Sequence, residues 1–306
     1  MYVGALENYP ALIDRMANIA PLWGNRGDGL TAVRSPFVLR EWMTAEGLHT
    51  PVTLATTPTD TTTTWLVKPL ASGGGRGITP WRGEIVNPET HVCQSLCPGT
   101  PVSAVFLGEG GSAEFLGATE QWLGTADSDF EYVGNIGPIS LSDAQGDQVL
   151  RIGGTLARRA RLLGLFGVDL TIDGDRVFLI EVNPRYTASV ELLEWSQGRS
   201  LLGLHRAQSL NEPIPDVPRW PPLRGIVGKA ILRAPGNCAF GSRISARRIS
   251  RAGREFPTLA DIPDSGTPIE RGEPVLTVFA RGTTVEQCRL RLQKRLEAWA
   301  ARLRGS

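Results

Sequence analysis

The sequence predicts a mixed α/β (α+β) fold, and three segments carry this prediction. Residues 143–163 place apolar side chains at three- and four-residue steps, the spacing of one face of an amphipathic helix. Two runs of β-forming residues flank Asp173-Gly174-Asp175, which is a strong hairpin signal. A second amphipathic pattern, at 284–303, predicts a helix near the C-terminal end. Strand and helix periodicities in one chain therefore predict a mixed fold.

The first fifty residues predict mainly helix. A short strand is expected to lead into a helix over 10–20, and a turn follows at 24–29. Thr31 or Ser35 can cap a second helix that runs to about Glu46, and Gly47 suits the end of that helix. The polar run 56–64, TTPTDTTTT, is typical of a solvated loop.

Short strands are predicted from Trp65 onward, with a glycine-rich loop between the first two. The expected strands are WLVKPL, HVCQSL and VSAVFL, and GNIGP at 134–138 is a second glycine-containing loop. Helices are expected again near 188–194 and 200–210. The proline-rich stretch 211–223 predicts a linker, and IVGKAIL and EPVLTVFA predict two late strands.

Composition excludes several classes of function. The chain of 306 residues is 41% hydrophobic and 21% charged with a net charge of +1, which gives no footprint for nucleic acid or anionic lipid. Arginine is dense over 243–254, but acidic residues lie nearby, so a solvated surface is expected there. No apolar run approaches the ~20 residues that cross a bilayer, and the first residues do not resemble a signal peptide. A cytoplasmic protein without nucleic-acid or membrane partners is expected.

Cysteine and histidine supply little chemistry. The four cysteines show no metal-binding spacing, and the three histidines stand in no recognisable motif. We therefore expect any reaction to depend on carboxylates, cations, backbone amides and a metal ion.

The predicted hairpin carries the first candidate site. If residues 174–176 form its loop, Asp173 pairs with Val177 and Asp169 falls directly opposite Glu181. Side chains alternate across a strand, so Asn183 shares the face of Glu181. Oxygen ligands without histidine or cysteine favour Mg²⁺ or Mn²⁺ over zinc. An exposed hairpin with an ordinary polar face is the alternative.

The second candidate site is a lysine followed by a glycine-rich loop. Lys68 ends a predicted strand, and the loop is Ser72, Gly73, Gly74, Gly75, Arg76 and Gly77. Successive glycine N–H groups can cradle anionic oxygens, and the lysine adds a positive charge. The loop is neither a Walker A motif nor GxGxxG, because the required residues do not follow it. A flexible hairpin loop beside a lysine is the alternative.

Taken in order, these features resemble the ATP-grasp superfamily. A lysine at a strand end, a glycine-rich loop, a strand pair near Gln94 and a carboxylate hairpin closing in EVNPR cover most of residues 30–195. Within that superfamily the chain looks like predicted carboxylate–amine ligases distantly related to biotin carboxylase, of a type associated with one-carbon metabolism. YVGALENYP, GNIGP, GLFGVDL and EVNPRYTASVE carry that likeness.

The resemblance implies roles for individual residues. Lys68 matches the lysine on the nucleotide phosphates, and the glycine-rich loop matches the loop that closes over them. Gln94, Ser95, Leu96 and Cys97 match the hinge that bonds adenine. Asp169, Glu181 and Asn183 match the magnesium ligands, and Arg185 matches the arginine facing the transferred phosphoryl group. Substrate contacts are expected from Asn135, Gly137, Tyr186 and Ser189.

The chain departs from the family pattern near its start. Members usually carry another phosphate-binding lysine there, and Arg34 is the only candidate nearby. The expected domains are a short remnant of an N-terminal α/β domain at 1–33, an ATP-grasp domain at 34–210 with a lid at about 52–108, and a β-rich region at 211–306 ending in a helix.

The resemblance implies an ADP-forming ligase that uses ATP and Mg²⁺ (or Mn²⁺) to join a small-molecule carboxylate to an amine. Two alternatives stay open: a nucleotide-binding protein without ligase activity, and a biotin-carboxylase-like enzyme that uses bicarbonate as the acid. A homodimer is compatible with the sequence.

Overall fold

A computed structural model of the chain describes residues 1–125, 127–214, 216, 219–241 and 256–304. Its N-terminal part comprises η1 (Leu6–Asn8), α1 (Pro10–Ala17), α2 (Gly27–Arg34) and α3 (Pro36–Ala45). A first group of strands follows: β1 (Thr53–Leu54), β2 (Trp65–Pro69), β3 (Thr79–Pro80) and β4 (His91–Ser95). Next come β5 (Thr100–Glu109), β6 (Ala113–Leu123), β7 (Tyr132–Gly137), α4 (Asp143–Ala160), β8 (Leu163–Asp173) and β9 (Arg176–Asn183).

The remaining elements complete the chain. They are α5 (Ala188–Gln197), α6 (Leu202–Leu210), β10 (Ile226–Arg233), β11 (Cys238–Ala239), β12 (Leu259–Ala260), β13 (Pro268–Ile269), β14 (Pro274–Gly282) and α7 (Val285–Arg304). The strands form a large sheet, a four-stranded sheet and a small two-stranded one.

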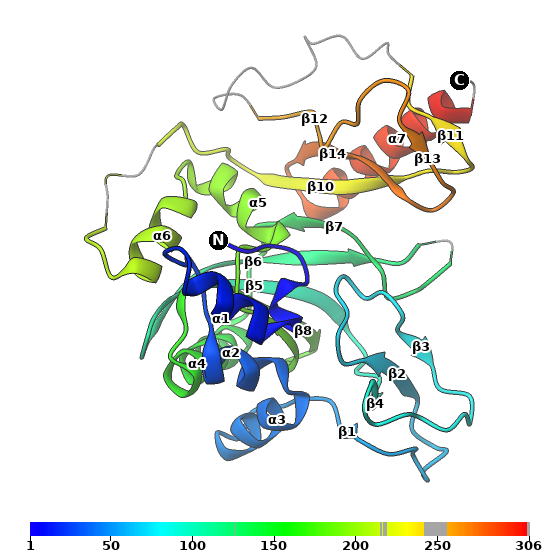
Figure 1. The fold of residues 1–306 in the computed structure, drawn as a ribbon. Coiled ribbons are helices and arrows are strands. Elements are labelled where there is room, and N and C mark those ends of the chain that lie inside the picture. The colour runs from blue at the N-terminus through cyan, green and yellow to red at the C-terminus, as the bar shows by residue number, and fades with distance from the viewer. Residues whose placement is uncertain (126, 215, 217–218, 242–255, 305–306) are drawn as a thin grey trace.

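The large sheet organises the molecule. Its eight strands lie in the order β12-β14-β10-β7-β6-β5-β8-β9, and every described pair is antiparallel. The late strand β10 pairs with β7, so the C-terminal strands extend the same sheet as the central hairpin (Figure 1). The helix α7 packs on β10 and β14 through buried Cys288 and Leu292.

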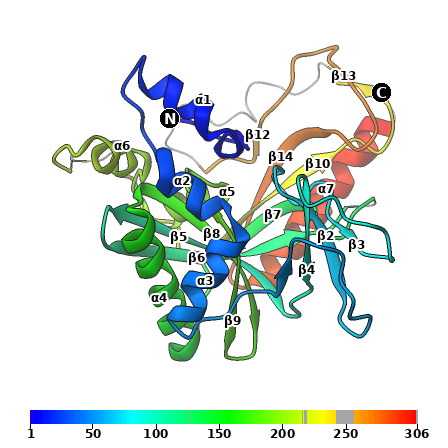
Figure 2. The same ribbon diagram turned by 60° about the horizontal axis from the view of Figure 1, so that its bottom comes forward.

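Helices cover both faces of the sheet because the strands bury side chains on both. On one face Val33, Met43 and Leu156 from α2, α3 and α4 pack against Phe106 and Phe166. Figure 2 shows α3 and α4 side by side beneath the sheet. On the opposite face, residues of α5 and α6 pack against β5 and β8 in a separate cluster. The strands between them are therefore fixed from both sides.

The four-stranded sheet, in the order β1-β4-β2-β3, stands to the side of the large one (Figure 1). It has a small core of its own around Trp65, Val86 and Cys93. The expected lid at about 52–108 overlaps this sheet, but β5 already belongs to the large sheet from Thr100 onward. The domain limits expected at 33 and 210 stay predictions.

Several expected elements differ in detail. Residues 1–24, all of which are described, contain no strand; their first element is the short η1. The helix expected from Thr31 or Ser35 to about Glu46 is α3, because Ser35 caps it by accepting from the N–H of Val38 at 3.4 Å. The preceding α2 begins at Gly27, within the turn expected over 24–29. The helix expected over 143–163 ends at Ala160, where Arg161 adopts a left-handed conformation.

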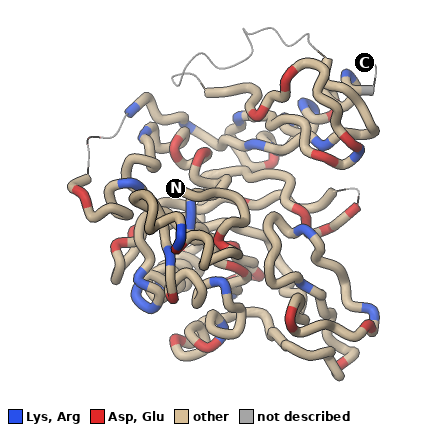
Figure 3. Tube along the Cα trace, in the orientation of Figure 1, with Lys and Arg blue, Asp and Glu red and all other residues tan. Residues whose placement is uncertain are grey.

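Charged residues are spread along the whole trace, with basic and acidic segments interspersed (Figure 3). The arginine-dense stretch 243–254 lies outside the described residues, as do parts of the expected linker at 211–223. Within the described ranges, no helix is both long and apolar enough to span a bilayer.

Candidate active site

A cavity of about 460 Å³ lies where the four-stranded sheet meets the large one. Its lining brings together most of the residues singled out in the sequence: Lys68, Gly74, Gly75, Gln94, Ser95, Leu96, Cys97, Asn135, Asp169, Glu181, Asn183, Arg185 and Ser189. A volume of this size is in the range of small-molecule sites. Six predicted residues are not part of the lining: Ser72, Gly73, Arg76, Gly77, Gly137 and Tyr186.

The β8–β9 hairpin places Asp169 opposite Glu181, as expected, but by a different route. The turn is one residue shorter than predicted, because Asp173 pairs with Arg176 rather than Val177. A bulge at Ile180 then shifts the register, since Leu170 pairs with Leu179 and Asp169 with Glu181. The bulge compensates for the shorter turn. The expected pair is therefore confirmed, and the expected loop is wrong.

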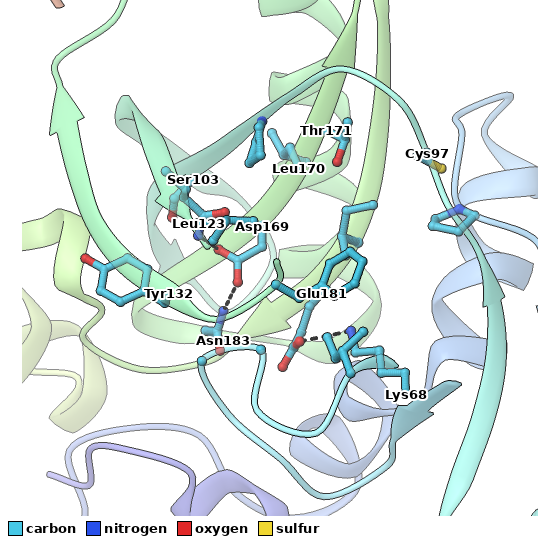
Figure 4. A pocket seen from close by; sticks show the side chains of 18 of the residues that line it. Lys68, Cys97, Ser103, Leu123, Tyr132, Asp169, Leu170, Thr171, Glu181 and Asn183 are labelled. Atoms are coloured by element: carbon cyan, nitrogen blue, oxygen red, sulfur yellow. Dashed lines mark hydrogen bonds and ion pairs between the residues drawn. The ribbon is translucent and has the colours of Figure 1, made fainter. Parts of the chain in front are cut away.

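Glu181 is held by two cations. Its Oε1 accepts from the Arg34 guanidinium at 2.6 Å. Its Oε2 accepts from Lys68 Nζ at 3.1 Å, a contact drawn in Figure 4. Burial raises the pKa of this carboxyl, but Lys68 and Arg34 outweigh burial and bring the pKa down to about 2. Glu181 is therefore ionised at neutral pH.

Among the described residues, Asp169 has no cationic partner in direct contact. Its two carboxylate oxygens accept from Gln121 Nε2 at 2.9 Å and from Asn183 Nδ2 at 2.8 Å (Figure 4). Burial, together with the nearby charge of Glu181, raises the pKa of Asp169 to about 6. A second carboxylate beside Glu181 is thus electrostatically unfavourable without a further positive charge.

This donor set fits a hard divalent cation. Asp169, Glu181 and Asn183 offer only oxygen ligands, and an added cation would relieve the repulsion that raises the Asp169 pKa. Asn183 presents Nδ2 to Asp169, so coordination through Asn183 requires its amide to turn over. Among the described residues no three His, Cys, Asp or Glu side chains form a ready-made cluster, so Asn183 or water must complete the set.

The glycine loop, residues 72–77, lies closed against the start of β7. Gly74 O accepts from the N–H of Tyr132 at 3.0 Å. A Cβ on Gly75 would stand 1.9 Å from the carbonyl oxygen of Phe130, and its φ of +75° is in the left-handed region. Only glycine allows this approach. Gly74 and Gly75 face the cavity, whereas Ser72, Gly73, Arg76 and Gly77 form the outer part of the loop.

The predicted hinge lines the cavity beside the glycine loop. The N–H groups of Ser95 and Leu96 already donate to Val52 O and Thr64 O, each at 2.8 Å. Among the described residues, the Leu96 carbonyl and the Cys97 N–H have no main-chain partner. These two groups are therefore the ones available to an adenine edge.

The far end of the cavity is neutral and polar. Asn135 Nδ2 donates to Thr119 Oγ1 at 2.9 Å and to Ser189 Oγ at 3.1 Å, and Tyr132 OH donates to Asn135 Oδ1. Asn135 and Ser189 are thus brought together as expected. Gly137 packs its backbone against Thr119, and the hydroxyl of Tyr186 donates to Glu194 at 2.8 Å, away from the cavity lining.

Between the two ends lies Arg185, followed by the start of α5. Arg185 Nε donates to Glu7 Oε1 at 2.9 Å and its NH2 donates to Asn183 Oδ1 at 3.2 Å. Thr187, at the N-terminus of α5, is 8% exposed and lines the cavity. Its Oγ1 is buried without a hydrogen-bond partner in the described part of the chain. An unsatisfied hydroxyl at a helix N-terminus suits an anionic ligand.

Comparison with known proteins agrees with this arrangement. The family model described as ATP-grasp domain matches residues 36–189, which is half of the chain. The match includes every residue that lines the cavity and leaves out residues 1–35. The chain belongs to the ATP-grasp family. Its fold, with mixed helices and antiparallel sheets and a helix after the β-rich region, is the ATP-grasp fold.

Curated relatives of this ATP-grasp chain match only parts of their own length. An uncharacterized protein of Methanocaldococcus jannaschii is 25% identical over 225 residues, which cover 71% of this chain and 51% of the relative. Formate-dependent phosphoribosylglycinamide formyltransferase of Pyrococcus furiosus is 36% identical over 89 residues, 28% of this chain and 21% of the enzyme. The chain therefore spans about half the length of the first relative.

Solved structures share the fold at low identity. The biotin carboxylase domain of Hydrogenobacter thermophilus 2-oxoglutarate carboxylase, in complex with MgADP, ADP and bicarbonate, has a TM-score of 0.72 and 15% identity, over 96% of this chain and 72% of that one. L-amino acid ligase from Bacillus licheniformis has a TM-score of 0.67 and 16% identity, over 93% and 75%.

Sequence reasoning missed two residues that line this ATP-grasp cavity and one, Glu7, that contacts a lining residue. Gln121 and Thr187 carry no motif signal, because an amide or a hydroxyl in a strand or before a helix is common. Glu7, 2% exposed, meets Arg185 across 178 positions of the chain, a separation that no local pattern reveals. Arg34 was noted only as a substitute for a lysine, and its contact with Glu181 depends on the packing of α2 against β9.

Proposed function

We propose that the chain is an ATP- and Mg²⁺-dependent, ADP-forming ligase that activates a carboxylate as an acyl phosphate for attack by an amine. One observation carries the proposal: Lys68, Arg185 and the Asp169–Glu181 pair line one cavity together with Gly74 and Gly75 of the glycine loop, and Arg34 contacts Glu181 at 2.6 Å. ATP-grasp proteins are generally ligases, and the substrates proposed here go beyond that general statement.

The nucleotide would enter with its adenine against the Leu96 carbonyl and the Cys97 N–H. Lys68 and Arg34, now bound to Glu181, would turn to the phosphate oxygens. The glycine loop would close over the phosphates through the N–H groups of Gly74 and Gly75. Arg34 thereby fills the place of the missing early lysine, and its guanidinium offers two donors to one phosphate.

Asp169, Glu181 and Asn183 would hold Mg²⁺. The ion supplies charge neutralisation at the phosphate oxygens, which is the main requirement of phosphoryl transfer. Glu181 would exchange its bonds to Lys68 and Arg34 for the cation, and those two side chains would then be free for the nucleotide. Asp169 gains the positive neighbour that its raised pKa indicates is missing.

The carboxylate substrate would lie between Arg185 and the N-terminus of α5, where the Thr187 hydroxyl has no partner among the described residues. One of its oxygens attacks the γ-phosphorus, the bond from phosphorus to the β-phosphate oxygen breaks, and ADP leaves. The amine nitrogen then attacks the acyl carbon, the carbon–oxygen bond to phosphate breaks, and the amine proton passes to the released phosphate. Positioning and charge stabilisation supply the catalysis. The polar end at Asn135 and Ser189 would contact the acid or the amine.

A substrate screen with nucleotide analysis tests the proposal. Panels of carboxylic acids and amines, with Mg²⁺ and ATP, should release ADP and phosphate in an acid-dependent manner. Glu181→Gln should reduce turnover by about a thousandfold. Glu41→Gln, an exposed change on α3, should leave turnover unaltered. Release of AMP in place of ADP would contradict the mechanism.

The same screen separates the alternatives. Tight binding of MgATP without ADP release under any acid or amine would identify a nucleotide-binding protein. ADP release that depends on bicarbonate would identify the carboxylase-like reaction instead. The amide-forming ligase is preferred because Arg185 and the buried Thr187 hydroxyl offer a carboxylate site adjoining a polar pocket.

A further inference from the structure

The segment of residues 2–8 touches the cavity walls from outside. Tyr2 OH lies 3.0 Å from both Asn25 O and Pro184 O, which anchors the segment beside the end of β9. Glu7 is buried and pairs with Arg185 at 2.9 Å. The segment is therefore fixed at both ends, and the side chain that follows Glu7 is held in a defined place.

Asn8 contacts both Arg34 and the glycine loop. Its Oδ1 accepts from Arg34 NH2 at 2.8 Å, and its Nδ2 donates to the carbonyl oxygen of Ser72 at 3.1 Å. Arg34 in turn holds Glu181 through NH1 at 2.6 Å. A continuous chain of bonds thus runs from the hairpin carboxylate to the glycine loop.

The glycine loop is held from its other side as well. Tyr132 N–H donates to Gly74 O, and Gly75 packs directly on the Phe130 carbonyl. Both of these contacts are made by main-chain atoms, and Gly73 approaches only the side chain of Ala5. Among the described residues, the side-chain hydrogen bond that holds the loop is therefore the one from the Asn8 amide to Ser72. A single substitution can remove it.

We propose that Asn8 is a positioning residue that latches the glycine loop closed over the cavity and ties that closure to Arg34. The identity of the enclosed ligand as a nucleotide rests on the proposed function, but the latch itself does not. The two polar atoms of the Asn8 amide have different roles. Nδ2 holds the glycine loop through Ser72, and Oδ1 orients the Arg34 guanidinium that contacts Glu181. Closure of the glycine loop is therefore coupled to the alignment of Arg34 with Glu181.

Trypsin cleavage after Arg76 measures the latch without any turnover. Arg76 is exposed at the tip of the loop, and it becomes a better substrate when the loop opens. In the nucleotide-free protein, Asn8→Ala should be cleaved after Arg76 about fivefold faster than wild type, the ratio expected from one hydrogen bond. Asn18→Ala is the matched control, because Asn18 is exposed and its side chain has no hydrogen bond to any described residue.

Asn8→Asp separates the two halves of the amide. It keeps an oxygen for Arg34 and places a second oxygen against the Ser72 carbonyl, so the loop bond alone is lost. Cleavage should be at least as fast as in Asn8→Ala. Asn8→Asp also serves if Asn8→Ala does not fold, and thermal melting shows whether a faster cut reflects loop opening or unfolding of the whole chain.

The second readout uses MgADP as the probe. Asn8→Ala should bind MgADP about fivefold more weakly, because closure must now be supplied by the ligand. If turnover is found, KM for MgATP should rise by the same factor while kcat stays within about twofold, a split that loss of fold would not give.

Two outcomes would overturn the latch. One is equal cleavage after Arg76 in Asn8→Ala and wild type. The other is fast cleavage in Asn8→Ala with wild-type cleavage in Asn8→Asp, which would assign the effect to Arg34 alone. If the chain binds nucleotide without turnover, the cleavage and MgADP effects should persist and only the KM comparison is lost. If it binds no nucleotide, cleavage in the nucleotide-free protein should still follow the expected pattern and only the MgADP effect is absent.

Discussion

The two ends of the cavity are built on different principles. At one end Lys68, Arg34, Asp169 and Glu181 place charges of both signs within a few ångströms of one another. At the other end Thr119, Asn135 and Ser189 form a buried network that carries no charge. Arg185 and Thr187 also line the cavity. The charged end suits phosphate and metal, whereas the neutral end suits recognition by shape and hydrogen bonds.

This contrast indicates that one end of the cavity serves the reaction and the other end selects the substrate. Charge stabilisation is common to all acyl-phosphate chemistry, so the charged end can be shared by enzymes with different substrates. A neutral network recognises one arrangement of donors and acceptors, because an unmatched buried group costs ~1–3 kcal/mol. Changes at the charged end should therefore alter the rate, and changes at the neutral end should alter the choice of substrate.

The largest expected effect tests the charged end. Asp169→Asn should reduce turnover about a thousandfold, because a proposed metal ligand loses its charge. In EDTA the same variant should be more stable by about 2 kcal/mol at pH 8, since burial and Glu181 raise the Asp169 pKa to about 6. Asp175→Asn, in the exposed turn of the same hairpin, is the control for both measurements. A parallel loss of stability and turnover would contradict the assignment.

The second effect concerns the stability of the large sheet that carries both ends of the cavity. His205, on α6, accepts from the N–H of Leu165 at 2.8 Å and is fully buried behind β8. Burial lowers the His205 pKa to about 4 from an ordinary value near 6.5. Below pH 6.5 the unfolded chain takes up a proton that the folded chain excludes until about pH 4, so stability falls as pH decreases through this window.

The size of the His205 contribution is up to about 3 kcal/mol. His205→Asn keeps an acceptor for Leu165 and removes the titration. Urea unfolding of wild type and variant at pH 7.5 and pH 4.5 should show a stability difference between the two proteins that shrinks at the lower pH. Curves separated by a constant amount would mean that His205 does not contribute to the acid sensitivity of the sheet.

The third effect concerns closure over the charged end. Gly75→Ala should weaken MgADP binding by about thirtyfold, because its Cβ would meet the Phe130 carbonyl at 1.9 Å in a left-handed backbone. Gly74→Ala shares the left-handed backbone, with a φ of +64°, but its nearest neighbour would be 4.0 Å away. The matched pair separates steric contact from backbone strain. Equal affinities in both variants would show that the observed closed loop is not the binding conformation.

The smallest effect tests the boundary between the two ends. Thr187→Val should raise KM for the acid about tenfold and leave MgADP affinity unchanged, because it removes one hydrogen bond to a charged group. Thr187→Ser keeps the hydroxyl and should behave as wild type. If Thr187→Val weakens MgADP instead, the hydroxyl belongs to the nucleotide part of the cavity and the division proposed here is misplaced.

The hairpin shows how far sequence reasoning reaches. The spacing of Asp169 and Glu181 around Asp173-Gly174-Asp175 predicted a cross-strand pair, and the pair is present. The turn and the bulge at Ile180 were not predictable from the spacing. The turn is one residue shorter than expected and the bulge adds one residue to β9, so Asp169 and Glu181 are paired as they would be without either change. Alternation along a strand is a strong signal, whereas a bulge depends on neighbouring strands.

Two of the predicted substrate contacts are not part of the cavity lining, for a related reason. Gly137 and Tyr186 stand next to cavity residues in sequence, but Gly137 packs on Thr119 and Tyr186 turns to Glu194. Adjacent residues of an extended segment point to opposite sides, so proximity in sequence does not decide which side chain faces a ligand. The expected N-terminal strand failed because the residues there pack as isolated turns and helices.

The sequence by itself determined the family, the hairpin pair and the positions of Lys68 and the glycine loop, because each depends on a local period or a short motif. Tertiary structure alone decided that the Thr187 hydroxyl is buried without a partner within the described ranges. It also decided that Arg34 and Lys68 share Glu181, and that Glu7 and Asn8 reach Arg185 and the loop. Those contacts join segments more than sixty residues apart, and only packing of both faces of the large sheet brings such segments within hydrogen-bonding distance.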